Sequence, residues 1–423
     1  RTPVNTTLTA MEPFDLSAYS GTQVKVRLQT PYSSAGVGAG VVDVMVTNIL
    51  DPRGVFVGGY SNRTVGGTSL VVTGLLPEVT YYYRVRAYAS DTCTSGHSDT
   101  RSLTTLAYES IWDAGGGNNR NWTTAANWDG DVLPQTNATT YFYSAINGVS
   151  AMVDLDGNQT VKGLRFMDGA AANVNIRSNT LTIFSGGIGV GAGAAGDLAI
   201  LSDVTAAADQ TWTNASTRDF TIAGALSGAG AVDKRGSGRI VLTSDDSTYT
   251  GVLTINEGAL QIRGTNALGT TGAGTVVADG AALEAHGGGD PVDFAAEPLT
   301  ISGSGVSGGG ALRFVQNNVD FKGAITLAAS ARIQAASNSP IASGAIAIGA
   351  NTLYAGVAAE ATEMRLGGNL SGTRTDGDGA FVKDGPSRLT LSGNNAGLTG
   401  LFNLQAGEIR IGSANAMGLI GTL

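Results

Sequence analysis

The chain contains one stretch of sequence twice. Residues 234–269 and 383–418 align without a gap, 149 positions apart. Self-similarity among short apolar runs indicates a solenoid, in which each repeat buries its apolar side by stacking on its neighbours. The aligned pairs are Lys234 with Lys383, Leu242 with Leu391, Gly251 with Gly400, Gly258 with Gly407, Leu260 with Ile409, and Ile262 with Ile411.

The pattern of short strands continues through residues 135–423. Apolar runs such as 181–184 and 240–243 alternate with Gly, Asn, Asp and Ser, and no window has the periodicity of a long amphipathic helix. The 62 Gly accompany 42% apolar residues, so they indicate frequent tight turns rather than disorder. Evenly spaced strands without hairpin turns predict an all-β fold with about a dozen parallel coils.

Within each copy the alternation predicts which side chains point inward. We expect apolar columns to form from Leu242, Ile255, Leu260 and Ile262 in copy one, and from Leu391, Leu404, Ile409 and Ile411 in copy two. The four shared glycines, Gly251, Gly258, Gly400 and Gly407, are expected at chain corners with positive φ.

A segment rich in tryptophan, residues 108–134, precedes the solenoid. Trp112, Trp122 and Trp128 are separated by Gly and Asn, and the segment ends at Pro134. We interpret it as a junction whose aromatic side chains cap the open core of the first coil. The alternative is a sugar-stacking platform, because indole faces bind sugar rings.

Residues 1–107 have a different texture, with most of the tyrosines. In residues 81–89, Tyr81, Tyr83 and Val85 share one face while Tyr82 and Arg84 share the other, as in a strand of a β-sandwich.

The segment GLLPEVTYYYRVRA, residues 74–87, resembles the corner between the last long strands of a fibronectin type III domain. This resemblance implies a β-sandwich over residues 1–107 in which Tyr81 is the tyrosine-corner residue. The tryptophan usual on an early strand is absent, since all four Trp lie beyond residue 110. Residues 1–22 resemble the tail of a preceding module.

The duplicated unit, ending in STYTGVLTINEGALQIRGTNALG in copy one, resembles the autotransporter-associated β-strand repeat of bacterial passenger domains. The opening motif IWD…NWD…P also resembles the start of such passengers. Together these likenesses cover about three-quarters of the chain. They imply a right-handed parallel β-helix exposed on the bacterial cell surface, and they imply no single activity.

Few residues suggest catalysis or metal binding. His97 and His286 lack a matching Ser and acid, so a Ser-His-Asp site is not expected. Asp154 and Asp156 share a strand face and are expected to be a solvated pair, although polysaccharide-cleaving β-helices do use carboxylate pairs. The pairs Asp245–Asp246 and Asp376–Asp378 fit turns. Cys93 is the single cysteine, so a cysteine-based metal site is not expected. Together with the isolated histidines and carboxylates, this predicts no enzyme activity, no cofactor and no metal site.

The net charge of −9 argues against nucleic-acid binding, and no apolar run is long enough for a membrane-spanning helix. We therefore expect a non-enzymatic extracellular structural or adhesive protein: a stiff rod, or a subunit of a filament or layer. Its expected partners are other copies of itself, other surface proteins, or glycans. Two alternatives stay open, a secreted carbohydrate-binding or carbohydrate-active protein, and an autotransporter passenger with a membrane barrel beyond residue 423.

Overall fold

A computed structural model of the chain describes residues 24–27, 43–50, 61, 63–65, 69–72, 75, 79–90, 93–94, 97–105 and 109–418, apart from 143–150, 168–172, 288–291, 317 and 374–379. The chain divides into two compact units, residues 1–108 and 109–423. None of the helices in these described ranges has the length and apolarity that crossing a membrane requires.

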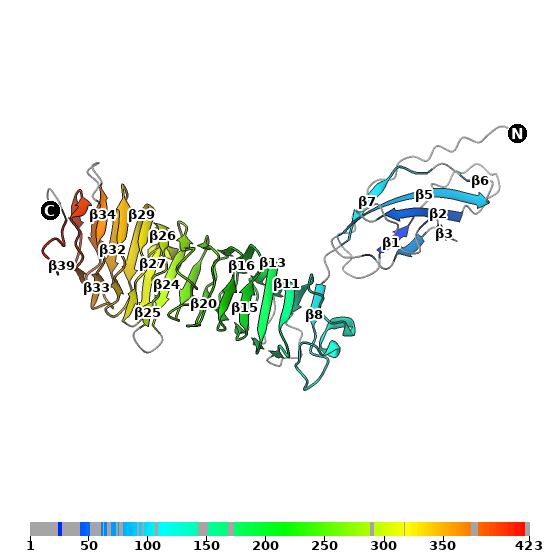
Figure 1. Cartoon of the computed structure of the whole chain (residues 1–423), viewed down its shortest axis with the longest axis horizontal. Coiled ribbons are helices and arrows are strands. Elements are labelled where there is room, and N and C mark those ends of the chain that lie inside the picture. Colours follow the sequence, from blue (N-terminus) through cyan, green and yellow to red (C-terminus); the bar gives the residue numbers. More distant parts are fainter. Residues whose placement is uncertain are drawn as a thin grey trace. The chain divides into compact units, whose positions relative to one another are not determined.

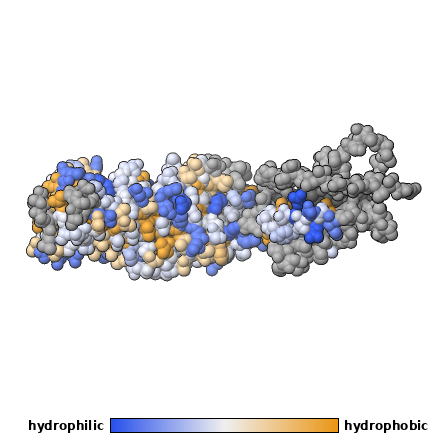
Figure 2. All heavy atoms as spheres, turned by 90° about the horizontal axis from the view of Figure 1, so that it is seen from above, coloured by the Kyte–Doolittle hydropathy of each residue, from blue (hydrophilic) through white to orange (hydrophobic). Residues whose placement is uncertain are grey.

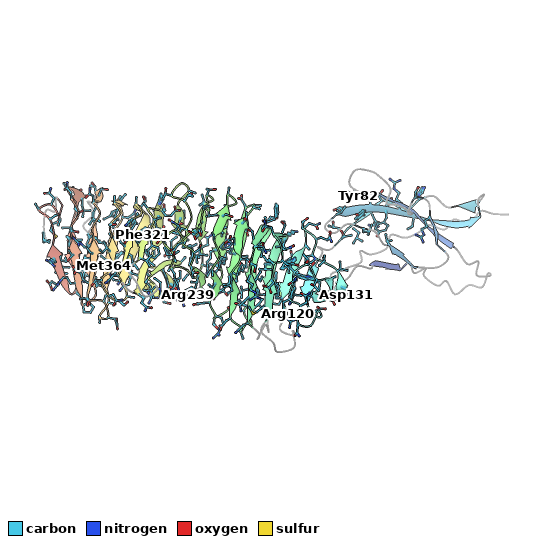
Figure 3. The ribbon with its side chains drawn as sticks, turned by 60° about the horizontal axis from the view of Figure 1, so that its bottom comes forward. Tyr82, Arg120, Asp131, Arg239, Phe321 and Met364 are labelled. Atoms are coloured by element: carbon cyan, nitrogen blue, oxygen red, sulfur yellow. The ribbon has the colours of Figure 1, made fainter. Side chains whose placement is uncertain are left out.

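The first unit consists of antiparallel strands in two sheets. Strand β1 pairs with β4, while β2 lies between β3 and β5, and β5 also pairs with β6 and β7. In β5, Tyr81 is buried and Tyr82 is exposed (Figure 3), so alternate side chains face opposite ways. The bounds are β1 (Val24–Arg27), β2 (Asp43–Leu50), β3 (Arg63–Val65), β4 (Ser69–Val72), β5 (Thr80–Ser90), β6 (Cys93–Thr94) and β7 (Arg101–Thr104).

The second unit is a parallel β-solenoid of about 11 turns, whose strands stack one above another (Figure 1). Each turn contributes segments to three stacks of parallel strands, here named the first, second and third stack. The first stack contains β8 (Glu109–Trp112), β9 (Thr139–Phe142), the second half of β11 (Gln159–Phe166), the second half of β13 (Thr180–Val190), β16 (Gln210–Asn214), β19 (Val232–Arg235), β21 (Leu253–Ile255), β23 (Thr275–Val277), β26 (Leu299–Gly303), the first half of β29 (Ile325–Ala335), β31 (Ile346–Gly349), β34 (Leu370–Thr373) and β37 (Gly397–Thr399).

The second stack follows the first along the chain in every turn. It contains β10 (Ala151–Asp154), β12 (Val174–Arg177), β14 (Leu198–Ile200), β17 (Phe220–Ile222), β20 (Ile240–Leu242), β22 (Ala259–Ile262), β24 (Ala282–His286), β27 (Leu312–Gln316), the second half of β29, β32 (Leu353–Val357), β35 (Phe381–Asp384) and β38 (Phe402–Leu404).

The third stack is interrupted. Its lower part contains the first halves of β11 and β13 with β15 (Asp203–Ala206) and β18 (Leu226–Gly228); its upper part contains β25 (Val292–Phe294), β28 (Val319–Phe321), β30 (Ile341–Ala342), β33 (Glu363–Leu366), β36 (Arg388–Leu391) and β39 (Glu408–Ile411). Between the two parts, residues 247–250 and 265–270 continue the stack without forming strands. Backbone bonds still connect these levels, for example from Thr248 N to Leu226 O at 2.8 Å and from Thr270 N to Tyr249 O at 2.8 Å.

Alternation of side chains explains why these segments form strands. In β16, Gln210, Trp212 and Asn214 are buried while Thr211 is exposed. Inward side chains of successive turns pile up at the strand spacing of about 4.8 Å, and the backbone bonds its neighbours above and below. Phe142 stacks on Phe166 with ring centroids 5.3 Å apart, which continues one such column. The core is therefore a narrow shaft along the whole solenoid.

The length of a turn varies. Ile240 pairs with Leu260, 20 positions later, whereas Glu109 pairs with Thr139, 30 positions later. Strand β8 belongs to the segment expected as a junction, and this pairing makes it the first strand of the solenoid. Among the residues that the structure describes there are also three short 3₁₀ helices: η1 (Ala125–Asn127), η2 (Asp129–Asp131) and η3 (Val306–Gly308). The prediction of an all-β chain with a parallel β-solenoid is confirmed.

Candidate functional site

A buried lysine occupies an inward core position in copy one of the repeat. Lys234 is fully buried in β19, in register between Trp212 and Ile255 of the neighbouring turns. Its Nζ donates hydrogen bonds to the carbonyl oxygens of Gly236 (2.7 Å), Gly238 (2.6 Å) and Glu257 (2.7 Å). The three ammonium protons therefore each have an acceptor, and they tie a turn to the next turn above it.

Lys383 has a similar arrangement in copy two, in which two of the three acceptors, Gly385 and Ala406, correspond to Gly236 and Glu257 of copy one. Lys383 is fully buried in β35, and its Nζ donates to the carbonyl oxygens of Asp384 (2.7 Å), Gly385 (2.7 Å) and Ala406 (3.0 Å). Burial lowers the pKa of both lysines, to about 8 for Lys234. We name each set of three bonds a lysine staple.

A glycine 24 positions after each lysine makes room for the staple. Gly258 has φ of 63°, and a Cβ on it would lie 2.5 Å from Gly236 O and 2.7 Å from the Lys234 Nζ. Gly407 has φ of 78°, with the corresponding distances of 2.5 Å to Gly385 O and 2.9 Å to the Lys383 Nζ. The left-handed backbone and the close approach both require glycine at these positions.

The other two shared glycines differ from each other. Gly400 has the expected positive φ, 128°. Gly251 does not, so the expectation of a left-handed corner there is wrong. Glycine is needed at this position for space, because a Cβ would lie 2.5 Å from both Gly230 O and the Tyr249 Oη.

The apolar positions of copy one point into the shaft. Leu242, Ile255, Leu260 and Ile262 are all buried, and so is Leu391 in copy two. Ile409 is half-buried, whereas Leu404 and Ile411 are 48% and 52% exposed, which differs from the expected inward columns. These residues lie in β38 and β39, where no further described turn packs over them.

The two copies do not occupy the same stack. Copy one starts at β19 in the first stack, and copy two starts at β35 in the second stack. The first stack advances six strands from β19 to β34 before β35 follows, so the copies are separated by six turns plus one further stack. Each staple therefore depends on its own turn and the adjacent turn, and not on its stack.

The three tryptophans lie in the core at the first turn. Trp112, Trp122 and Trp128 are 1%, 3% and 0% exposed, with Trp128 edge-on to both others at 5.0 and 4.7 Å. The Trp128 Nε1 donates to the Trp122 carbonyl at 2.7 Å, and Trp112 lies 6.2 Å from the ring of Phe142. Sugar stacking needs an open ring face, so this burial contradicts the platform interpretation and favours the cap.

The acidic candidates have structural partners. Asp154 forms an ion pair with Arg177, which lowers the pKa of its carboxyl group. Asp156 accepts hydrogen bonds from the Thr123 backbone N–H and hydroxyl. Asp245 accepts from the Thr265 N–H at 2.6 Å in a turn. Asp154 and Asp156, the two carboxylates expected to face solvent as a pair, therefore have separate partners: Arg177 for Asp154 and Thr123 for Asp156.

The remaining candidates do not converge on one site. Tyr81 is buried in β5, and its register partner is Leu103 in β7. His97 lies in the first unit and His286 at the end of β24 in the second. Asp376 and Asp378 lie outside the described residues. In the described ranges, no three His, Cys, Asp or Glu side chains gather as metal ligands would.

A polar network on the outer side of the second stack was missed by the sequence reasoning. Glu284 of β24 is only 5% exposed and contacts Arg239, Gln261 and Arg313, which come from three other turns. Arg332 similarly forms two 2.7 Å bonds with Asp384, 52 positions away, across the turn that contains Gly356. A Cβ on Gly356 would lie 2.5 Å from the Arg332 guanidinium.

Among the comparisons with known proteins, a match was found for the repeat. Comparisons with curated proteins and with solved structures gave no match. The passenger-associated-transport-repeat family model matches residues 232–262 and 381–411. These segments are related by the same offset of 149 positions, and each contains one complete lysine staple. Two segments of the chain thus match the passenger-associated-transport-repeat model, and both are built into one parallel β-solenoid.

Proposed function

We propose that this chain is part of a secreted, surface-exposed passenger that acts as a stiff, non-enzymatic rod with a structural or adhesive role. The observation that carries this proposal is the pair of passenger-type repeats, each stapled by a buried lysine within one continuous shaft. The backbone of each turn bonds the adjacent turns, so the fold can lengthen by adding turns and does not have to enclose an active site.

The distribution of polar groups supports a non-enzymatic role. Several ionisable side chains of the described faces form ion pairs with each other across turns, as in the pairs Arg177–Asp154, Arg239–Asp219 and Arg332–Asp384. On the face that Figure 2 presents, hydrophilic and hydrophobic residues are interspersed along the solenoid. Such a surface suits a rod that contacts water along its length.

Two finer features belong to the same proposal. The solenoid is right-handed, as the family resemblance implies. The first unit is a fibronectin type III-like sandwich, supported by its antiparallel strands in two sheets and by the buried Tyr81. Both features suit a modular protein outside the bacterial cell.

Labelling of intact cells of the source organism tests the location. Antibodies against the purified chain should bind intact cells, and external protease should remove the signal while a cytoplasmic marker survives. Signal that appears only after cell lysis would refute surface exposure. Electron microscopy of the native material should show rods or regular filaments, and a globular outline would contradict the rod. Release of reducing ends from polysaccharides by the pure chain would contradict the non-enzymatic role.

A further inference from the structure

One outer patch of the second stack holds more positive charge than its partners neutralise. We name the side chains of Arg239, Arg263 and Arg313 the arginine patch. They surround Glu284, which is in register with Gln261 below and Arg313 above. Figure 3 labels Arg239, which marks this region of the solenoid. The patch spans four consecutive turns, from the turn of β20 to that of β27.

Glu284 organises the patch from beneath. Its buried carboxylate accepts from the Gln261 Nε2 at 2.9 Å, lies 3.1 Å from the Arg239 Nη1 and lies 3.4 Å from the Arg313 Nη1. Gln261 in turn accepts from the Arg263 Nε at 2.7 Å. One carboxylate thus positions two guanidinium groups directly and a third through an amide.

The arginines differ in how many donors they have left. Arg239 uses two donors on Asp219, at 2.9 and 2.7 Å, and a third on Glu284, so it is largely committed to the structure. Among the described residues, Arg263 bonds only the neutral Gln261, and Arg313 contacts only Glu284. A guanidinium has five N–H donors, so Arg263 retains both terminal nitrogens for a carboxylate or sulfate group. The Nε of Arg313 is buried, so Arg313 offers its terminal nitrogens only.

The local charge is positive although the whole chain carries −9. Three guanidinium groups face two carboxylates, those of Asp219 and Glu284. Neighbouring His286 responds to this charge: burial lowers its pKa most, and Arg263 and Arg239 lower it further. An anion approaching this patch is therefore attracted by a local net positive charge.

The shape of the patch decides the class of ligand. It follows a sheet whose turns are stacked at about 4.8 Å, so its donors are arranged along the solenoid axis. A suitable occupant is an extended polymer whose acidic groups recur along its length, as they do in polysaccharides built from acidic sugars. Nucleic acid fits poorly, because a polyanion of that charge density needs a broadly basic surface.

We propose that the arginine patch binds an acidic polysaccharide, with Arg263 and Arg313 contacting its carboxylate or sulfate groups. Glu284 and Gln261 are positioning residues that hold these guanidinium groups outward. This inference is independent of the proposed structural role, because loss of binding at the patch would leave the solenoid itself unchanged.

Titration of the full chain with two probes tests the proposal. Polygalacturonate and a chondroitin sulfate-type oligosaccharide should each bind at low salt and weaken as salt is raised. The double variant Arg263→Gln/Arg313→Gln should bind at least about tenfold more weakly, since each lost bidentate pair removes a charge-assisted contact. A matched control, Arg235→Gln/Lys322→Gln, removes two positive charges from the first and third stacks and should change affinity less than about threefold.

Three results would overturn the proposal. They are the absence of binding at low salt, an equal loss in the control variant, and equally tight binding of polyglutamate, which would indicate an acidic peptide as the ligand. Thermal unfolding of each variant checks that the solenoid is intact: a cooperative transition should remain, with a lower midpoint in the double variant because the buried Glu284 loses its contact to Arg313.

Discussion

The two copies of the repeat share one local structure but differ in their surroundings. Lys234 and Lys383 each bond three carbonyl oxygens, although they belong to different stacks. Copy one lies in the middle of the solenoid, where Ile262 is 1% exposed; its equivalent in copy two, Ile411, is 52% exposed. The comparison teaches that the staple is a property of two adjacent turns, whereas burial of the apolar columns requires turns on both sides.

Shortening one apolar core side chain should produce the largest difference in stability between the two copies. Ile262→Ala removes a fully buried side chain and should lower the free energy of unfolding by about 4 kcal/mol. Ile411→Ala should cost less than about 1 kcal/mol, because half of that side chain is already in water. Urea unfolding of both variants measures the difference. Equal losses would mean that further packing covers Ile411 in solution.

Removal of the staple should have the next largest effect. Lys234→Met keeps the length of the side chain but leaves three carbonyl oxygens without a donor, which should cost about 3 kcal/mol. Lys383→Met should cost about half as much, because its acceptor Ala406 lies in an exposed segment where water can replace the ammonium. Hydrogen exchange should show faster exchange in β19 to β22 for Lys234→Met. No change there would show that the staple is dispensable.

Substitution of the glycines that accommodate the staples should cause the third largest loss of stability. Gly258→Ala places a Cβ at positive φ and 2.5 Å from Gly236 O, and should cost about 2 kcal/mol. Gly280→Ala is the matched control, because Gly280 has φ of 81° but nothing within 4 Å of the added Cβ. The control should lose only about 1 kcal/mol, from backbone strain alone. Equal costs for the two variants would show that the close approach contributes nothing.

The sequence predicted the solenoid because it shows both a repeat at an offset of 149 positions and local alternation of apolar residues, as at Leu260 and Ile262. The sequence did not predict that the copies lie in different stacks. The length of a turn varies from 20 to 30 residues, so a spacing of 149 positions does not determine which stack a segment joins. Lys234 had a local signal, because it lies two positions after the buried Val232 and so shares its inward side. The contact between Arg239 and Glu284 had none, because 45 residues and two turns separate them.

The smallest expected effect is a dependence on pH, which compares wild type with Lys234→Met. The pKa of Lys234 is about 8 in the folded chain and about 10.5 when unfolded, so the unfolded chain binds more protons between these values. The free energy of unfolding should therefore rise with pH across this window, by about 1 kcal/mol from pH 7 to pH 9. Below pH 7 the lysine is protonated in both states and contributes no slope.

Urea midpoints at several pH values measure this slope, and the difference between wild type and Lys234→Met cancels the titration of other groups. Lys383→Met should remove a slope of the same sign, because burial also lowers the pKa of Lys383. A wild-type slope identical to that of Lys234→Met would mean that the three carbonyl oxygens hold the proton as firmly as water does. The staple would then be a fixed ammonium site at any pH that the solenoid survives.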